Sequence, residues 1–332
     1  MTSMFPAHAR HRDALPQLGE TPFLTDGGLE TTLIFHDGHD LPYFAAYDLL
    51  IRDGGEDALR RYFEPYVRIA LAREIGIVLE TPTWRASPDW AARMGHSGDR
   101  LEALNRRAVE LLHELRDELG TEETPIVISG CVGPRGDGYV VGATMTADEA
   151  ANYHGAQIRS LAEAGVDLVS AITMTYADEA VGIVRAAQAV GLPVVISFTV
   201  ETDGRLPSGQ PLGDAIDDVD ARSDGAVAYF MVNCAHPSHF YDVLEPGSGW
   251  TDRIRGVRAN ASRLSHAELD EAEALDMGDP EELAHEYVAL RERLPRLTVL
   301  GGCCGTDHRH IDAMSEAFLA REQESAERNS AA

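Results

Sequence analysis

Apolar runs alternate with amphipathic stretches along almost the whole chain. The apolar runs are short and rich in β-branched residues, which is typical of parallel strands that are buried on both faces. The stretches between them place apolar residues three or four positions apart, as on one face of a helix. We predict strands at 22–25, 77–80, 126–129, 166–171, 194–200, 226–234, 254–259 and 297–300.

Several stretches between the predicted strands also carry the signals that begin and end helices. Thr146 and Glu149 have the spacing of a capping box, and Gly165 is suited to end the helix that follows. Asp99 is a plausible N-cap for a helix over 100–119, and Pro65 marks a kink in a helix over 58–75. Further helices are predicted at 177–190, 211–221, within 262–294, and at 308–319.

This order of elements predicts the architecture. Eight strands alternating with helices, with no second composition regime, predict an α/β protein with a single (β/α)8 TIM barrel over residues 21–320. Residues 1–20 are expected to form a loosely held arm, and residues 321–332 a flexible polar tail. A doubly wound open sheet is the alternative, but no Gly-x-Gly-x-x-Gly follows the first strand.

The composition of the chain excludes several functional classes. The 332 residues carry a formal net charge of -27, so the surface should repel nucleic acid and anionic membranes. All 28 basic residues are arginine, which excludes a Schiff-base lysine and a P-loop lysine. Neither a membrane-length apolar run nor an apolar signal core is present, so we predict a cytoplasmic protein. Homo-oligomerisation remains open.

Two adjacent cysteines follow the last predicted strand, in Gly301-Gly302-Cys303-Cys304-Gly305-Thr306. Adjacent thiols reach one metal ion only from an irregular turn, because side chains on a regular strand point to opposite faces. A third cysteine, Cys234, ends the sixth predicted strand. Three strand-end cysteines match a zinc site with one open position. Simple burial of free thiols and a vicinal disulfide are the alternatives.

Other reactive side chains also fall at strand ends, where a barrel gathers its chemistry. Glycines follow Asp26 and permit close approach of a ligand, while Trp84 could stack on a cationic methyl donor. Purely structural roles are the alternatives to ligand binding: a turn formed by the Asp-Gly pair, an ion pair of Glu80 with Arg85, and packing of Trp84 in the core. Cys131 is interpreted as a spare thiol rather than a ligand. The predicted substrate-binding residues are Asp26, Gly27, Glu80, Thr81, Trp84 and Asn260.

Several motifs together resemble those of the homocysteine S-methyltransferase family. They are Thr25-Asp26-Gly27-Gly28-Leu29-Glu30-Thr31, Gly130 to Pro134, Ile196-Ser197-Phe198-Thr199, Gly204-Arg205-Leu206, Gly209-Gln210-Pro211-Leu212, Val232-Asn233-Cys234 and Gly301 to Thr306. The resemblance implies a Zn²⁺-bearing barrel in which Cys234, Cys303 and Cys304 bind the metal and are the catalytic residues. It also implies that the thiol of a small-molecule acceptor becomes a metal ligand.

One position departs from the pattern of that family. Ile172 stands where the family often has a glutamate that holds the substrate ammonium, and Glu80 is the residue here that could replace it. The resemblance implies methyl transfer from a sulfonium or quaternary ammonium donor, with homocysteine as the expected acceptor and methionine as the product. A metal-dependent lyase or demethylase acting on a sulfur compound, and a non-catalytic thiol- or zinc-binding protein, are the alternatives. The sequence does not identify the donor.

Overall fold

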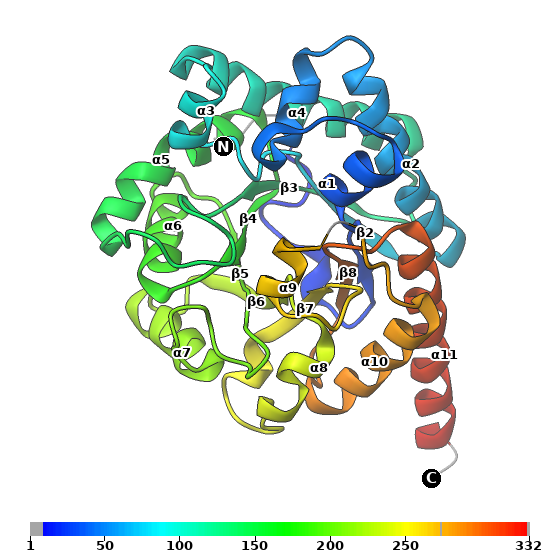
Figure 1. The fold of residues 1–332 in the computed structure, drawn as a ribbon. Helices are drawn as coiled ribbons and strands as arrows, with labels where there is room; N and C mark the ends of the chain where they lie inside the picture. Colours follow the sequence, from blue (N-terminus) through cyan, green and yellow to red (C-terminus); the bar gives the residue numbers. More distant parts are fainter. Residues whose placement is uncertain (1–8, 273, 331–332) are drawn as a thin grey trace.

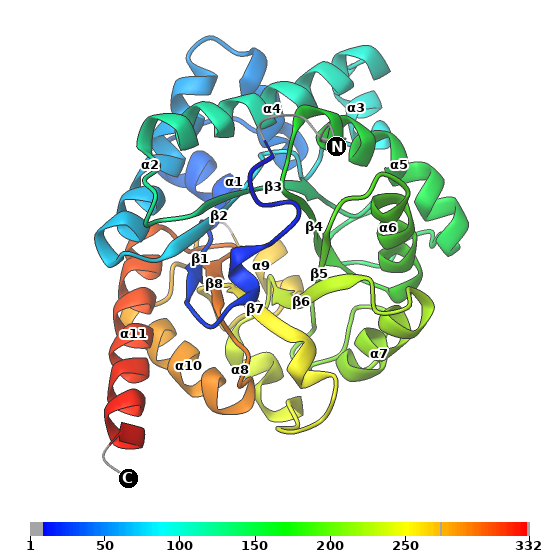
Figure 2. The ribbon, with the colours of Figure 1, turned by 180° about the vertical axis from the view of Figure 1, so that it is seen from behind.

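Eight parallel strands close into a barrel in their order along the chain (Figure 1). Strand β1 lies between β2 and β8 (Figure 2). The computed structural model describes residues 9–330 except residue 273. Each predicted strand overlaps an observed one, which confirms the predicted (β/α)8 barrel. The strands are β1 (Phe23–Leu24), β2 (Gly76–Glu80), β3 (Ile126–Val132), β4 (Leu168–Met174), β5 (Val194–Phe198), β6 (Val227–Asn233), β7 (Ile254–Ala259) and β8 (Val299–Gly302).

Helices form a ring around the barrel, as both views of the ribbon show (Figures 1 and 2). The long helices cover the outer face of the sheet, and the short ones lie in the loops at its rim. The α-helices are α1 (Leu29–Thr31), α2 (Gly55–Arg73), α3 (Pro88–Arg93), α4 (Gly98–Leu119), α5 (Ala147–Ala164), α6 (Ala177–Ala189), α7 (Leu212–Arg222), α8 (Pro237–Phe240), α9 (His266–Asp270), α10 (Pro280–Arg293) and α11 (His308–Ser330).

The strands are buried on both faces, which explains their continuous apolar character. Alternate residues such as Val127, Val195 and Val299 point inward and fill the barrel in one apolar cluster. Their neighbours, including Ile128 and Ile196, pack in a second cluster that joins the sheet to the helices. Nearer the ends of the strands the barrel interior also contains buried charged side chains, among them Glu80 and Arg258, which belong to the site described below.

Helix boundaries follow local capping chemistry, with one correction. The capping box of Thr146 and Glu149 is present, and Gly165 ends α5 in the left-handed conformation at φ 97°. The predicted N-cap Asp99 is wrong: α4 begins earlier, and the hydroxyl of Ser97 accepts a hydrogen bond from the Arg100 N–H. Both residues suit an N-cap, so only the backbone conformation distinguishes them. Helix α2 continues through Pro65.

The two ends of the described chain are more ordered than expected. Residues 9–20 cross the bottom of the barrel, seen from behind in Figure 2. There Arg12 donates hydrogen bonds to the carbonyls of Ala162 and Val166, and Leu15 packs into the barrel interior. The predicted tail is helical as far as Ser330, because α11 continues through residues 321–330. Residues 1–8 and 331–332 of the predicted arm and tail lie outside the described residues.

Two glycines of the last strand, β8, are needed for close packing rather than for a turn. Gly301 and Gly302 follow the predicted strand at 297–300, but in the structure both belong to β8. A Cβ atom on Gly301 would collide with the Oγ1 atom of Thr25, and one on Gly302 would collide with that of Thr306. The close approach of β1 and β8 therefore requires glycine here. The turn itself comes later, at Gly305 with φ 80°.

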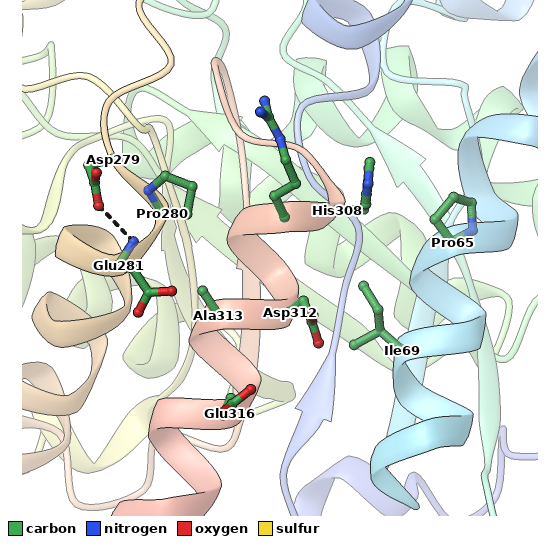
Figure 3. A pocket seen from close by; sticks show the side chains of 10 residues that line it. Pro65, Ile69, Asp279, Pro280, Glu281, His308, Asp312, Ala313 and Glu316 are labelled. Atoms are coloured by element: carbon green, nitrogen blue, oxygen red, sulfur yellow. Dashed lines mark hydrogen bonds between the residues drawn. The ribbon is translucent and has the colours of Figure 1, made fainter.

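A surface pocket lies between α2, α11 and the start of α10 (Figure 3). Four of its ten lining residues are acidic and none is a cysteine, so the pocket is separate from the thiol cluster at the strand ends. No helix in the described part of the chain combines the length and the apolar character that crossing a membrane requires. The lining residues are Pro65, Ile69, Asp279, Pro280, Glu281, His308, Arg309, Asp312, Ala313 and Glu316.

Candidate active site

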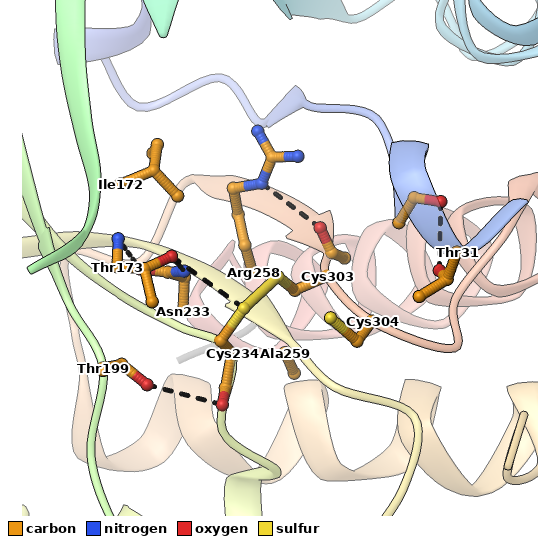
Figure 4. The surroundings of a disulfide bond; sticks show 12 residues. Thr31, Ile172, Thr173, Thr199, Asn233, Cys234, Arg258, Ala259, Cys303 and Cys304 are labelled. Atoms are coloured by element: carbon orange, nitrogen blue, oxygen red, sulfur yellow. Dashed lines mark hydrogen bonds between the residues drawn. A yellow bond between two sulfur atoms is a disulfide. The ribbon is translucent and has the colours of Figure 1, made fainter. Parts of the chain in front are cut away.

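Three cysteines converge at the C-terminal end of the barrel (Figure 4). Cys234 directly follows β6, and Cys303 and Cys304 directly follow β8. Their sulfur atoms all lie within 4.8 Å of one another, a spacing that allows them to hold a single metal ion. Cys234 has the left-handed conformation, at φ 51°, so the chain turns sharply where the strand ends. The predicted convergence of these three residues is therefore present.

The structure also joins two of these cysteines in a disulfide. Cys234 and Cys303 are bonded, with 5.4 Å between their Cα atoms, whereas Cys304 and Cys131 are free. This pairing differs from the expectation that the cysteines serve a metal rather than a disulfide, and it is not the vicinal pair either. Metal ligation needs thiolates. A metal could therefore use all three sulfur atoms only after this bond is reduced.

Backbone hydrogen bonds from neighbouring strands fix the turn that carries Cys303 and Cys304. The N–H of Gly302 donates to the Asp26 carbonyl at 2.9 Å, and the N–H of Cys303 donates to the Ala259 carbonyl at 2.7 Å. The Ala261 N–H donates to the Cys304 carbonyl at 3.1 Å. The turn is thus held by the ends of β1 and β7, which leaves its thiols little freedom to move apart.

A buried arginine, Arg258, lies at the centre of the barrel mouth. Its Nη2 atom donates to Asp26 Oδ1 at 2.7 Å, and its Nε atom donates to the Gly302 carbonyl at 3.2 Å (Figure 4). Burial raises the pKa of Asp26, although Arg258 and the hydroxyl of Tyr62 oppose that effect. The sequence reading missed Arg258; its only signal was a charged residue at an inward position of an apolar strand, Ile254–Ala259.

Two further carboxylates, Glu80 and Glu30, interact with the charge of this arginine. Glu80 is 5% exposed, and its Oε1 atom lies 4.0 Å from Arg258 Nη1, while its Oε2 atom has no hydrogen-bond partner in the described structure. The anticipated partner, Arg85, is not the one it has. Burial raises the pKa of Glu80 to about 7. Burial likewise raises the pKa of the half-buried Glu30 to about 7, with a smaller contribution from the charge of Asp26. The sequence reading did not single out Glu30 as a site residue.

Trp84 already carries a cation on one face of its ring. The guanidinium of Arg85 lies 3.9 Å from the ring centroid of Trp84 and 3.9 Å from that of Trp90, so it is sandwiched between them. The indole N–H of Trp84 donates to the Ile172 carbonyl at 3.1 Å. Any methyl donor that stacks on Trp84 would therefore use the face opposite Arg85.

The remaining predicted residues line the rim in different ways. The hydroxyl of Thr81 accepts a hydrogen bond from the Cys131 N–H at 2.9 Å, which makes it part of the strand framework. Gly27 lies against Thr306 so closely that a Cβ atom would be 2.9 Å from its carbonyl. Asn260 is buried, and its Oδ1 atom has no hydrogen-bond partner among the described residues. Ile172 packs inside the barrel and offers no charge to a ligand.

A tyrosine and a histidine from two rim loops cover the thiols. The hydroxyl of Tyr139, in the loop after β3, lies 3.4 Å from Cys304 Sγ, and its ring stacks on His266 with 4.0 Å between centroids. Burial raises the pKa of Tyr139 above its usual value near 10. Neither residue was among those predicted. Tyr139 lies in a loop without a periodic pattern and His266 begins the short helix α9, so only the folded structure brings the two residues together.

We expect Cys131→Ser to keep both metal binding and turnover. Cys131 is 7% exposed and lies inside the barrel among apolar side chains, and burial raises the pKa of its thiol. It is also absent from the group of three sulfur atoms. Metal content per chain, measured by mass spectrometry of the acid-digested protein, provides the check. Loss of metal in this variant would show that the site has four protein ligands and no room for a substrate.

Comparison with known proteins points to one enzyme family. The family model described as "Homocysteine S-methyltransferase" matches residues 23–318. The chain is similar to "Homocysteine S-methyltransferase 1" of Arabidopsis thaliana, with 22% identity over 318 residues that cover 90% of this chain and 94% of the relative. It is also similar to "Homocysteine S-methyltransferase 4" of Zea mays, with 26% identity and 90% of each chain covered.

Solved structures share the fold. The oxidised form of the homocysteine methyltransferase MmuM from Escherichia coli superposes with a TM-score of 0.73 and 21% identity, covering 92% of this chain and 98% of that one. The metallated form of the same protein gives a TM-score of 0.69 and 20% identity, covering 90% and 96%. At these identities the likeness establishes the barrel and leaves the assignment of individual residues to the geometry of this chain.

Proposed function

Because the chain belongs to the homocysteine S-methyltransferase family, we propose that it is a zinc-dependent enzyme that methylates the thiol of homocysteine to give methionine. The observation that carries the metal part of this proposal is the convergence of Cys234, Cys303 and Cys304 within 4.8 Å at the barrel mouth. The methyl donor is a sulfonium or a quaternary ammonium compound, because its positively charged sulfur or nitrogen then leaves as a neutral thioether or amine.

The residues present fit a zinc ion. Zinc prefers thiolate ligands in a tetrahedral arrangement, and three protein ligands leave one position for a substrate. When bound, zinc supplies the positive charge that keeps the acceptor sulfur deprotonated at neutral pH, where a free thiol with a pKa of about 8.5 is only a few per cent thiolate. Cys234, Cys303 and Cys304 would hold the ion in their reduced state.

The chemical step requires little from the protein beyond position. The acceptor thiol loses its proton to water, and a sulfur lone pair then forms a bond to the methyl carbon. The bond from that carbon to the positively charged sulfur or nitrogen of the donor breaks, and its electron pair stays on the donor. The protein contributes alignment of the two substrates and exclusion of water. The turn fixed by the ends of β1 and β7 supplies that alignment for the acceptor.

The charges around the mouth favour an acceptor that carries an ammonium group. Three carboxylates lie near the buried Arg258: Asp26 and Glu80 are within 4.0 Å of it, and Glu30 is close enough to interact with its charge and with that of Arg85. Glu30 forms no ion pair with any residue that the structure describes. Burial outweighs the favourable charges of Arg258 and Arg85 at Glu30 and raises its pKa to about 7, so a further cation beside it would stabilise its ionised form. The ammonium group of homocysteine would supply that cation.

Incubation of the reduced, zinc-loaded protein with a panel of thiols and methyl donors tests the proposal. Mass spectrometry should find one methylated thiol and one demethylated donor for each turnover, with methionine as the product from homocysteine. Cleavage products of a sulfur compound would indicate a lyase instead. Tight thiol binding without any product would indicate a binding protein.

We expect Glu80→Gln to lower kcat/KM for homocysteine about tenfold or more, because a charge that helps to hold the ammonium is lost. The matched acceptor is 4-mercaptobutyrate, which has the same thiol chain and carboxylate but no ammonium, and its kcat/KM should change little. Glu30→Gln is the parallel variant, and comparison of the two locates the stronger contact. Equal losses for both acceptors would contradict ammonium recognition by these carboxylates.

A further inference from the structure

The loop between β3 and α5 extends over the thiol cluster and places one hydroxyl group on it. The carboxylate of Asp137 accepts hydrogen bonds from the N–H groups of Tyr139 at 2.7 Å and Val140 at 3.1 Å, which fixes the tip of this loop. The hydroxyl of Tyr139 then lies 3.4 Å from Cys304 Sγ. Among the described residues, this is the one hydrogen bond between the Cys304 sulfur and another side chain.

The ring of Tyr139 is held from its other side by His266. The two rings are stacked with 4.0 Å between centroids and 13° between planes. The Nε2 atom of His266 lies 2.7 Å from the carbonyl oxygen of Cys234, and its Nδ1 atom lies 3.3 Å from Glu201 Oε1. The stack therefore connects the side chain of one candidate ligand to the backbone of another, across two loops that are more than a hundred residues apart in sequence.

We propose that Tyr139 is a positioning residue of the metal site: its hydroxyl donates a hydrogen bond to the sulfur of Cys304 when that sulfur is a metal-bound thiolate, and its stack on His266 holds the hydroxyl in place. This inference rests on the proposed function, because it requires the three cysteines to bind a metal. A thiolate can only accept a hydrogen bond, and a tyrosine hydroxyl is a donor at neutral pH. Such a donor orients the sulfur and draws electron density away from the metal.

The test compares Tyr139→Phe with the unmodified protein, since phenylalanine keeps the ring for stacking and removes the hydroxyl alone. Both proteins are reduced with a phosphine and titrated with Co²⁺, whose sulfur-to-metal charge-transfer absorption reports directly on the thiolates. We expect the affinity for Co²⁺ to fall about 10- to 100-fold, as is typical when the outer partner of a metal ligand is lost. The charge-transfer band should also move to longer wavelength, because a thiolate without its hydrogen bond gives up an electron more easily.

Tyr153→Phe is the matched control. Its hydroxyl also lies in a loop-facing position, where it donates to Ser87 Oγ at 3.1 Å, away from the cysteines. This variant should keep both the affinity and the band position. An unchanged band in Tyr139→Phe would overturn the inference even if affinity fell, because a general loosening of the loop lowers affinity without changing the donor to sulfur. Absence of a charge-transfer band in the unmodified protein would overturn the metal site itself and the inference with it.

Discussion

Replacement of Cys304 by serine is expected to remove the metal and to abolish methyl transfer. Cys304 contributes one of three sulfur atoms that lie within 4.8 Å of one another, and a serine hydroxyl stays protonated near neutral pH and binds zinc poorly. Two remaining thiolates would not hold the ion at micromolar concentration. Metal content per chain should therefore fall from about one to near zero, the one-metal stoichiometry being that of a three-cysteine site.

The matched control for this experiment is Cys131→Ser, in which a free cysteine of the same barrel is changed. Comparison of the two variants separates loss of a ligand from any general effect of removing a thiol. Both should retain the unfolding transition of a folded barrel, measured by circular dichroism after reduction. Full metal occupancy in Cys304→Ser would contradict the assignment of this residue as a ligand.

Replacement of Arg258 by methionine is expected to lower the free energy of unfolding by about 3–5 kcal/mol, as is typical when one partner of a buried ion pair is removed. Arg258 is 6% exposed and donates to Asp26 at 2.7 Å, and Glu80 lies 4.0 Å from it. Without the arginine, two buried carboxylates have no cation beside them. Urea unfolding monitored by circular dichroism measures the change.

The loss of stability caused by Arg258→Met should depend on pH in a defined direction. Burial already raises the pKa of Glu80 to about 7 and raises that of Asp26. A carboxyl whose pKa is higher in the folded than in the unfolded protein lowers stability as pH rises through that range. The loss caused by Arg258→Met should thus be larger at pH 8 than at pH 5, where Glu80 is largely protonated in the folded state.

Two further variants make this result specific. Arg255→Met changes an arginine of the same strand. Its Nη1 atom donates to the Gly19 carbonyl at an exposed position. This variant should lower the free energy of unfolding by less than about 1 kcal/mol. The double change Arg258→Met with Asp26→Leu removes both partners and should recover part of the lost stability. Equal costs for Arg255→Met and Arg258→Met would contradict a special role for the buried arginine.

The barrel was predictable because its pattern is local. Short apolar runs such as Ile126–Val132 contrast with the amphipathic stretch of α4, and each pattern reflects which faces are buried. The convergence of Cys234, Cys303 and Cys304 followed from the rule that strand ends of a barrel share one rim. Local sequence was sufficient for these conclusions, since neither depends on how long side chains are oriented.

Features that depend on long side chains or on irregular loops were not predictable. Arg258 reaches Asp26 across the barrel mouth, a contact between residues 232 positions apart. Tyr139 and His266 meet only because the loop after β3 folds toward the start of α9. The disulfide between Cys234 and Cys303 likewise depends on the distance between two strand ends. The sequence does not contain these distances. It therefore indicated candidate site residues but not the residues that they contact.

The seam where β8 meets β1 has a consequence for how the protein is made. The turn that carries Cys303 and Cys304 rests on residues from the very start of the barrel: the Gly305 N–H donates to the Thr31 hydroxyl, 274 positions earlier in the chain. A ribosome releases the N-terminal segment long before the last strand. Strand β1 therefore lacks its neighbour β8 until synthesis is nearly complete. The proposed metal site can therefore be completed only after translation of the whole barrel.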